Sequence, residues 1–223
     1  VTLPLALHGV VAKTDGTVVD VNVGDDAGDP VFCVTDLLPH LGNQQMAKKG
    51  SEVVEGENLD VLIGNRPLVV EPADDASDEE KEAAKEPVKA FALKLLEEKY
   101  GIAEEDFLSA EIEVVPAGRA RELGFDRSMV IGYGQDDRVC AYTSLEAQLA
   151  IETPKKTAVT VLVDKEEIGS VGATGMGSLF FENTIAEIAA LTGLESPLAL
   201  RRILAASRML SSDVSAGFDP AYA

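Results

Sequence analysis

Cysteine is almost absent from this chain of 223 residues, which contains only Cys33 and Cys140. The two thiols lie far apart in the sequence and form no Cys-x-x-Cys pair, so neither a disulfide framework nor a cysteine-based zinc site is expected. Cys140 also has no histidine near it in the sequence, which argues against a nucleophilic thiol. This cysteine usage fits a reduced, cytoplasmic protein.

Positive charge is scarce as well. The chain has 19 Lys and Arg against 39 Asp and Glu, a formal net charge of −20, which opposes binding to nucleic-acid phosphates or anionic lipids. No apolar run approaches the ~20 residues of a membrane span, and no basic segment of the kind that opens a signal peptide begins the chain. Neither nucleic acid nor a membrane is therefore expected as a partner.

The density of acidic charge is high between Glu71 and Glu86. This stretch contains eight acidic residues and only two basic ones, Lys81 and Lys85. This stretch has almost no large apolar side chain that could be buried in a core. We therefore predict a solvated, mobile loop over residues 71–86.

The sequence before this stretch is typical of β-structure. Strand-like residues 1–11 and 18–23 flank the turn signal at 14–17, which predicts a hairpin. A further apolar segment at 59–63 predicts another strand, and a helical inset is predicted over 37–49. Together these segments indicate a small β-rich unit.

A helix is predicted from Pro87 to near Gly101. Proline is favoured in the first helical turn, and apolar residues then recur at i, i+3, i+4 and i+7. Residues 111–115 predict a strand that follows this helix.

From about Asp126 the pattern changes to alternating strands and helices, which is typical of an α/β fold. The run Ala158–Val163 is apolar on both faces, as in a buried parallel strand. Helices are predicted from Thr143 through Leu149, over 183–191 and over 197–206.

Acidic segments follow apolar runs at 135–138, 164–170 and 211–213, where an α/β sheet commonly places functional residues. Carboxylates that converge at strand ends repel one another unless a cation lies between them. The pattern therefore predicts a divalent metal site. The alternative is that each segment is an ordinary surface turn.

Two adjacent glutamates, Glu166 and Glu167, could have different roles at such a site. If one of them binds a metal, its neighbour can act as a general base in metal-assisted hydrolysis. The glycines that follow, at 169, 172, 175 and 177, match neither the P-loop nor the dinucleotide fingerprint. We therefore expect these glycines to shape the loop that carries the glutamates, and no nucleotide to bind there.

The three acidic motifs together resemble those of the aspartyl aminopeptidase family of di-zinc metallopeptidases. They read D-D-R at 136–138, D-K-E-E-I-G-S at 164–170 and S-D-V-S at 212–215, in the order and spacing of that family. Segments 3–9 and 29–32 resemble its bacterial branch, and the resemblance extends over the whole chain. It implies an α/β fold in which a β-rich insertion (dimerisation) domain, residues 1–125, precedes part of an α/β/α zinc-peptidase catalytic domain, residues 126–223.

The resemblance also implies the role of each acidic residue. Asp136 would bridge two Zn²⁺ ions, and the peptide bond that joins it to Asp137 would be cis. Glu167 would be a terminal ligand of one zinc, and Asp213 a terminal ligand of the other. Glu166 would be the catalytic general base.

Two histidine ligands of the family have no counterpart in this sequence. The only histidines are His8 and His40, which match neither ligand motif. The chain also begins at Val1 without Met and ends at Ala223 without a capping element. We therefore expect an internal fragment of a longer enzyme, inactive by itself, whose three remaining carboxylates bind zinc weakly and have raised pKa values or a splayed arrangement.

His40 occupies the place of a family histidine that reaches the active site of a neighbouring subunit and stabilises the oxyanion. The resemblance therefore implies a catalytic role for His40, and the alternative is a histidine on a helix surface. His8 is interpreted as structural.

The function predicted for the parent protein is that of a cytoplasmic, homo-oligomeric zinc aminopeptidase. It would remove N-terminal residues, acidic ones in the resembled family, from peptides with water activated by two metals. Two alternatives stay open: a non-catalytic assembly or binding module of a larger oligomer, and a related deblocking aminopeptidase of different specificity.

Overall fold

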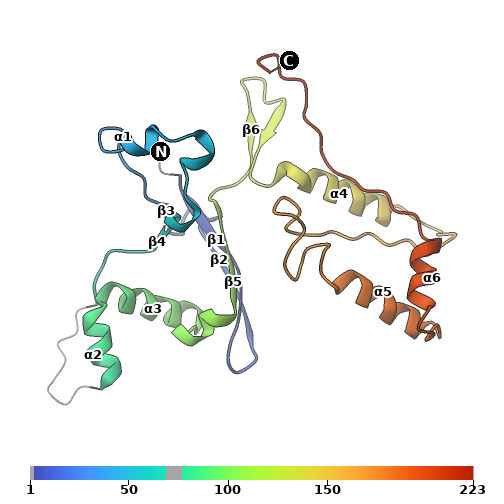
Figure 1. Cartoon of the computed structure of the whole chain (residues 1–223), viewed down its shortest axis with the longest axis horizontal. Helices are drawn as coiled ribbons and strands as arrows, with labels where there is room; N and C mark the ends of the chain where they lie inside the picture. The colour runs from blue at the N-terminus through green and yellow to red at the C-terminus, as the bar shows by residue number, and fades with distance from the viewer. Residues whose placement is uncertain (1–2, 69–76, 223) are drawn as a thin grey trace. The chain divides into compact units, whose positions relative to one another are not determined.

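The computed structural model describes residues 3–68 and 77–222, and they fall into two compact units (Figure 1). The N-terminal unit comprises residues 1–133, and the C-terminal unit comprises residues 134–223. No helix in the described ranges is long and apolar enough to cross a membrane.

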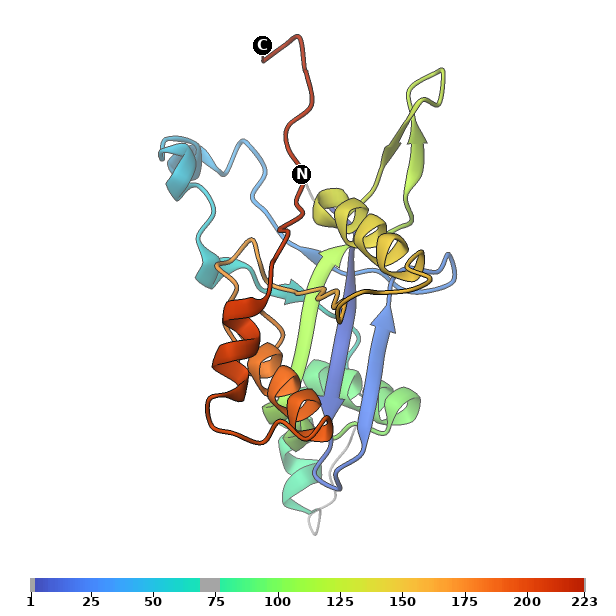
Figure 2. The ribbon, with the colours of Figure 1, turned by 90° about the vertical axis from the view of Figure 1, so that its right-hand side faces the viewer.

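The N-terminal unit is built on a three-stranded antiparallel sheet in the order β2-β1-β5 (Figure 2). Its strands are β1 (Leu5–Ala12), β2 (Val18–Val23) and β5 (Ala110–Pro116). A tight turn joins β1 to β2, in which the amide of Lys13 donates to the carbonyl of Thr17 at 2.8 Å. Both the predicted hairpin and the predicted strand at 111–115 are confirmed.

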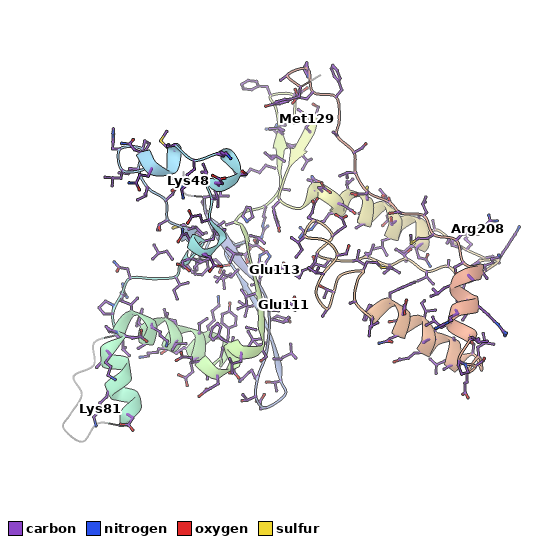
Figure 3. The ribbon with its side chains drawn as sticks, viewed as in Figure 1. Lys48, Lys81, Glu111, Glu113, Met129 and Arg208 are labelled. Carbon is purple, nitrogen blue, oxygen red and sulfur yellow. The ribbon has the colours of Figure 1, made fainter. Side chains whose placement is uncertain are left out.

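The central strand needs glycine at one position. Gly9 pairs with Val21 on one side and Ile112 on the other. A Cβ atom there would lie 2.0 Å from the carbonyl oxygen of Glu111, so no other residue fits without a shift of the backbone. Glu111 and Glu113, two residues apart on β5, are exposed and share one face of the sheet (Figure 3).

The core of this unit lies between the other face of the sheet and the segment after α3 (Pro87–Tyr100). Val11, Val21 and Val23 pack there with Ile102, which is 1% exposed. Partly buried neighbours complete the core: Val19, Phe32, Tyr100, Ala110 and Ile112. The helix predicted from Pro87 is confirmed. It ends at Gly101, which adopts a left-handed conformation (φ 63°) that favours glycine.

Short elements make up the rest of the N-terminal unit. Strands β3 (Cys33–Val34) and β4 (Val61–Leu62) pair with each other. Strands β6 (Arg121–Leu123) and β7 (Met129–Ile131) form a second pair, which Met129 marks in Figure 3. Short helical segments lie at α1 (Asn43–Met46), η1 (Gly50–Glu52), η2 (Gly56–Asn58) and η3 (Glu104–Ser109). The helical inset predicted over 37–49 is therefore wrong in length, because only α1 forms an α-helical turn there.

The acidic stretch was predicted as a loop over 71–86. Residues 71–76 lie outside the described residues, and α2 (Asp78–Lys85) is a helix, so the prediction is wrong for that part. Glu, Lys and Ala are strong helix formers even where no core is available to bury them. Charge alone therefore does not exclude a solvated helix.

The described residues of the C-terminal unit, 134–222, form three helices: α4 (Gln135–Leu149), α5 (Phe180–Leu191) and α6 (Ala199–Ala206). The two later helices begin within three residues of their predicted starts. Helix α4 begins eight residues before the predicted Thr143.

The apolar run 158–163 is not a strand, which corrects the prediction of a buried parallel sheet at this point. Residues 134–222 contain no paired strands, and Val159 and Leu162 are 52% and 55% exposed. Gln148 of α4 holds the extended run instead: its side-chain amide donates to the carbonyl of Ala158 at 3.2 Å, and its oxygen accepts from the Thr160 hydroxyl at 3.1 Å. A strand requires a partner to satisfy its backbone, and the described part of this unit supplies none.

A buried aspartate ties the β1–β2 turn to η3. Asp106 is 3% exposed, and its carboxylate accepts from the amide of Ala103 at 2.9 Å and from that of Thr14 at 3.1 Å. These two backbone hydrogen bonds, that from Ala103 first, lower the pKa of Asp106 below its ordinary value. The stabilisation is complete above about pH 3.8 and is lost as the pH falls through the lower pKa of the folded protein.

We therefore expect Asp106→Asn to lower the free energy of unfolding of the chain at pH 7, because one backbone donor then faces an amide group. The deficit relative to wild type should shrink as the pH falls below about 3.8. Urea unfolding followed by circular dichroism measures this, with Asp60→Asn, an exposed site, as the control. Equal stability of Asp106→Asn and wild type at pH 7 would contradict the expectation.

Candidate metal centre

The first acidic motif lies at the start of α4. Gly134 precedes the helix in a left-handed conformation (φ 75°), and Asp136 and Asp137 depart from helical geometry with ψ values of 110° and 27°. The peptide bond between these two aspartates is cis, as predicted. Asp136 is exposed, whereas Asp137 is half-buried.

The second motif lies in a closed loop, residues 164–178, which we call the glutamate loop. Within it the amide of Gly169 donates to the carbonyl of Glu166, and the amide of Ser170 donates to that of Lys165, both at 2.8 Å. The amide of Gly177 then donates to the carbonyl of Ser170 at 3.0 Å. These bonds fold the backbone back on itself around Glu166 and Glu167, whose side chains are exposed.

The fold of this loop depends on glycine. A Cβ atom at Gly175 would lie 2.5 Å from the carbonyl oxygens of Ser170 and Val171, and one at Gly177 would lie 2.8 Å from that of Ser170. These obstacles are backbone atoms, which cannot move aside as a side chain can. The glycines thus shape the loop that carries the glutamates, as predicted.

Gly175→Ala should therefore disrupt the glutamate loop, at a cost of about 1–3 kcal/mol of loop stability. Amide hydrogen exchange measures the effect, which we expect as faster exchange at Ser170 and Gly177. Gly217→Ala is the matched control, because a Cβ atom there would meet nothing within 4 Å. Unchanged exchange in Gly175→Ala would show that the close approach does not constrain this loop.

The three acidic motifs act on one another electrostatically. Asp136, then Glu166 and, more weakly, Asp213 raise the pKa of Glu167 above its ordinary value through charge repulsion, and a hydrogen bond with Asp136 adds to the effect. The three acidic segments, at Asp136, Glu166–Glu167 and Asp213, are therefore coupled electrostatically. A raised pKa is one of the two outcomes expected for carboxylates brought together without a cation.

The acidic residues of the three motifs do not form a closed metal-binding cluster. Among residues 3–68 and 77–222, no three His, Cys, Asp or Glu side chains are grouped closely enough to hold a metal ion. Asp213 lies on an exposed segment after α6, where its carboxylate accepts from the amide of Val214 at 2.7 Å. The site is thus splayed as well as electrostatically coupled.

The donor set fits zinc in kind. Zinc accepts carboxylate oxygens, and a divalent cation would relieve the repulsion that raises the pKa of Glu167. Asp136, Glu167 and Asp213 are the residues that would hold it. Three carboxylates are too few ligands for two zinc ions, because each zinc commonly has three or four protein ligands. The set also lacks the imidazole or thiolate groups that such sites commonly include.

The histidines lie in the other unit. His40 is exposed in a turn at 39–41, before α1 and not on a helix surface. His8 lies on β1, with its Nε2 3.0 Å from Oδ2 of Asp25 but outside hydrogen-bond geometry. The structure therefore places neither histidine in the C-terminal unit.

Sequence reasoning missed one polar group in this region. Asp164 and Thr174, ten residues apart, meet across the base of the glutamate loop, and Lys165 joins them. The hydrogen bond from Lys165, the largest cause, lowers the pKa of Asp164. Asp164 belongs to a recognised motif, but no spacing in the sequence pairs it with Thr174.

Comparison with known families assigns the chain. The profile described as aminopeptidase I zinc metalloprotease (M18) matches residues 2–223. The chain therefore belongs to this family of zinc metalloproteases, which confirms the resemblance seen in its motifs.

Individual relatives agree. A probable M18 family aminopeptidase 1 of Clostridium acetobutylicum is 59% identical over 222 residues, which are 100% of this chain and 45% of the relative. One of Thermotoga maritima is 46% identical over 99% of this chain and 46% of the relative. The chain thus spans slightly less than half the length of these relatives.

Solved structures support the fold. Aminopeptidase I from Clostridium acetobutylicum matches with a TM-score of 0.74 and 57% identity, over 99% of this chain and 45% of that one. Aminopeptidase I from Borrelia burgdorferi matches with a TM-score of 0.67 and 36% identity, over 98% of this chain and 45% of that one. The expected fold class, part of an α/β zinc-peptidase fold with a β-rich region before it, is confirmed.

Proposed function

We propose that the longer protein to which this chain belongs is a zinc-dependent aminopeptidase that removes N-terminal residues from peptides. The observation that carries the proposal is the match of residues 2–223 to the family described as aminopeptidase I zinc metalloprotease. Asp136, Glu166 and Asp213 also act electrostatically on Glu167 and raise its pKa. Carboxylates are the ligands and the base that metal-assisted peptide hydrolysis requires. The aminopeptidase names of the relatives support it.

In this proposal the carboxylates have separate roles. Asp136, Glu167 and Asp213 would hold the zinc, with Asp136 shared between two ions and Glu167 and Asp213 each binding one of them. Zinc, when bound, supplies Lewis-acid polarisation of the scissile carbonyl and lowers the pKa of water. Glu166 accepts the proton of the attacking water and passes it to the leaving amine.

The ligand set of the 223-residue chain is incomplete for this chemistry. Two zinc ions need more donors than three carboxylates provide, and both histidines lie in the N-terminal unit. We therefore propose that this chain alone is inactive and that other parts of the longer protein complete the site.

The N-terminal unit has a separate role in the proposal. It is an insertion domain that assembles a homo-oligomer, and its exposed His40 stabilises the oxyanion in a neighbouring subunit. The free thiols of Cys33 and Cys140 support a reduced, cytoplasmic location. The substrate is a peptide, and neither nucleic acid nor a membrane is a partner.

A peptidase assay on the longer protein tests this function. Fluorogenic substrates with N-terminal Asp, Glu, Leu and Lys are compared before and after removal of zinc by a chelator. We expect hydrolysis that chelation abolishes and zinc restores, with the acidic substrates preferred. Hydrolysis of other substrates only would indicate a related aminopeptidase of different specificity. Zinc-free protein without hydrolysis of any substrate would indicate an assembly module and would overturn the proposal.

A further inference from the structure

The glutamate loop is closed at its base by a small polar group. Oδ2 of Asp164 accepts from Nζ of Lys165 at 3.0 Å and from the hydroxyl of Thr174 at 3.4 Å. The backbone repeats the connection, because the amide of Asp164 donates to the carbonyl of Thr174 at 3.2 Å. Asp164 thus joins the start of the loop to Thr174 through both its main chain and its side chain.

The side chain of Lys165 is largely covered. It is 17% exposed, and its Cδ and Cε atoms lie 3.8 Å from where a Cβ atom would stand on Gly172. The lysine stem therefore passes close to Gly172, and its ammonium group ends on Asp164. This arrangement uses the apolar part of the side chain for packing and the charge for the hydrogen bond.

Glu166 and Glu167 follow Lys165 directly. The carbonyls of Lys165 and Glu166 accept from the amides of Ser170 and Gly169, so these two hydrogen bonds hold the backbone that carries both glutamates. Opening the base of the loop would release the glutamate backbone.

We infer that Asp164 and Thr174 are positioning residues that hold Glu166 and Glu167 in place for catalysis. Together with Lys165 they form what we call the clasp. The inference rests on the proposed function, because positioning has meaning only if the glutamates act.

Amide hydrogen exchange on the 223-residue chain tests the clasp without any catalytic readout. Thr174→Val removes the hydroxyl with little change of shape, and Asp164→Asn removes the charge. We expect about 3- to 10-fold faster exchange at Asp164, Ser170 and Gly177 in both variants. Thr174→Ser, which keeps the hydroxyl, should exchange as wild type does.

Thr184→Val is the matched control, because the Thr184 hydroxyl donates to the carbonyl of Phe180 within α5 and not to the loop. It should leave exchange in the glutamate loop unchanged. Unaltered loop exchange in Thr174→Val and Asp164→Asn would overturn the clasp. So would equal acceleration across α4 and α5, because that would mark general destabilisation.

Kinetics of the longer protein then test positioning. We expect Thr174→Val and Asp164→Asn to lower kcat about 10-fold or more with KM little changed, and Thr174→Ser to restore kcat. Wild-type kcat in both variants would overturn the positioning role even if the loop loosens. Absence of activity in the wild-type protein would instead refute the proposed function, and the exchange result would still decide whether the clasp holds the loop.

Discussion

Glu166→Gln, introduced into the longer protein, is expected to lower kcat by about 10²-fold or more while the bound zinc stays nearly constant. Glutamine has the shape of glutamate but cannot accept a proton, so the variant removes the general base and little else. The carboxylates that we propose as ligands, those of Asp136, Glu167 and Asp213, are left intact. Zinc content by atomic absorption and kcat with a fluorogenic substrate measure the two effects independently.

Glu167→Gln is the companion variant, because it makes the same chemical change one residue further along the same exposed loop. It should lose zinc as well as activity, since a ligand is removed. A loss of zinc that is equal in the two variants would show that the roles of Glu166 and Glu167 are wrongly assigned.

Ile102→Ala is expected to give the largest loss of stability in the N-terminal unit, about 2–5 kcal/mol of the free energy of unfolding. Ile102 is 1% exposed and packs against Val11, Val21 and Val23. Its truncation leaves a cavity between the sheet and the end of α3 that rigid strands cannot fill. Urea unfolding followed by circular dichroism measures the change.

Leu108→Ala provides the control from the same region. Leu108 is 93% exposed, so its truncation should change stability by less than about 0.5 kcal/mol. Similar losses in the Ile102 and Leu108 variants would mean that the core does not lie where the structure places it.

Local signals predicted the fold well where each element is supported by its own residues. The β1–β2 hairpin is specified by a turn sequence and by valines that alternate along Val18–Val23. Helix α3 is specified by Pro87 at its start and Gly101 at its end. The signals for each of these elements lie within the element's own short segment, so neither prediction depends on the rest of the chain.

Prediction failed where the structure depends on partners distant in the sequence. The run 158–163 has the composition of a buried strand, yet its observed partner is the Gln148 side chain. The acidic segment of α2 shows the opposite error, because low hydrophobicity concealed good helix propensity. An apolar composition indicates that a segment is buried in the complete fold. It does not identify the neighbouring element that buries the segment.

The three motifs predicted which residues belong to the candidate site, but they did not predict how those residues are arranged. The electrostatic coupling of Glu167 to Asp136, Glu166 and Asp213 agrees with the grouping expected from the three motifs. The clasp of Asp164 and Thr174 was missed, because a loop closure over ten residues leaves no periodic trace in a sequence. Roles of individual residues came from family resemblance and stay predictions.

Zinc content after dialysis tests the central claim most directly, since that claim is that Asp136, Glu167 and Asp213 form a metal site that this chain alone does not complete. The measurement compares the longer protein, its Asp136→Asn and Asp213→Asn variants, and the 223-residue chain. We predict two zinc ions per subunit in the longer protein, fewer in each variant and none in the 223-residue chain. Tight stoichiometric zinc in the 223-residue chain, or two zinc ions retained by both variants, would contradict the account.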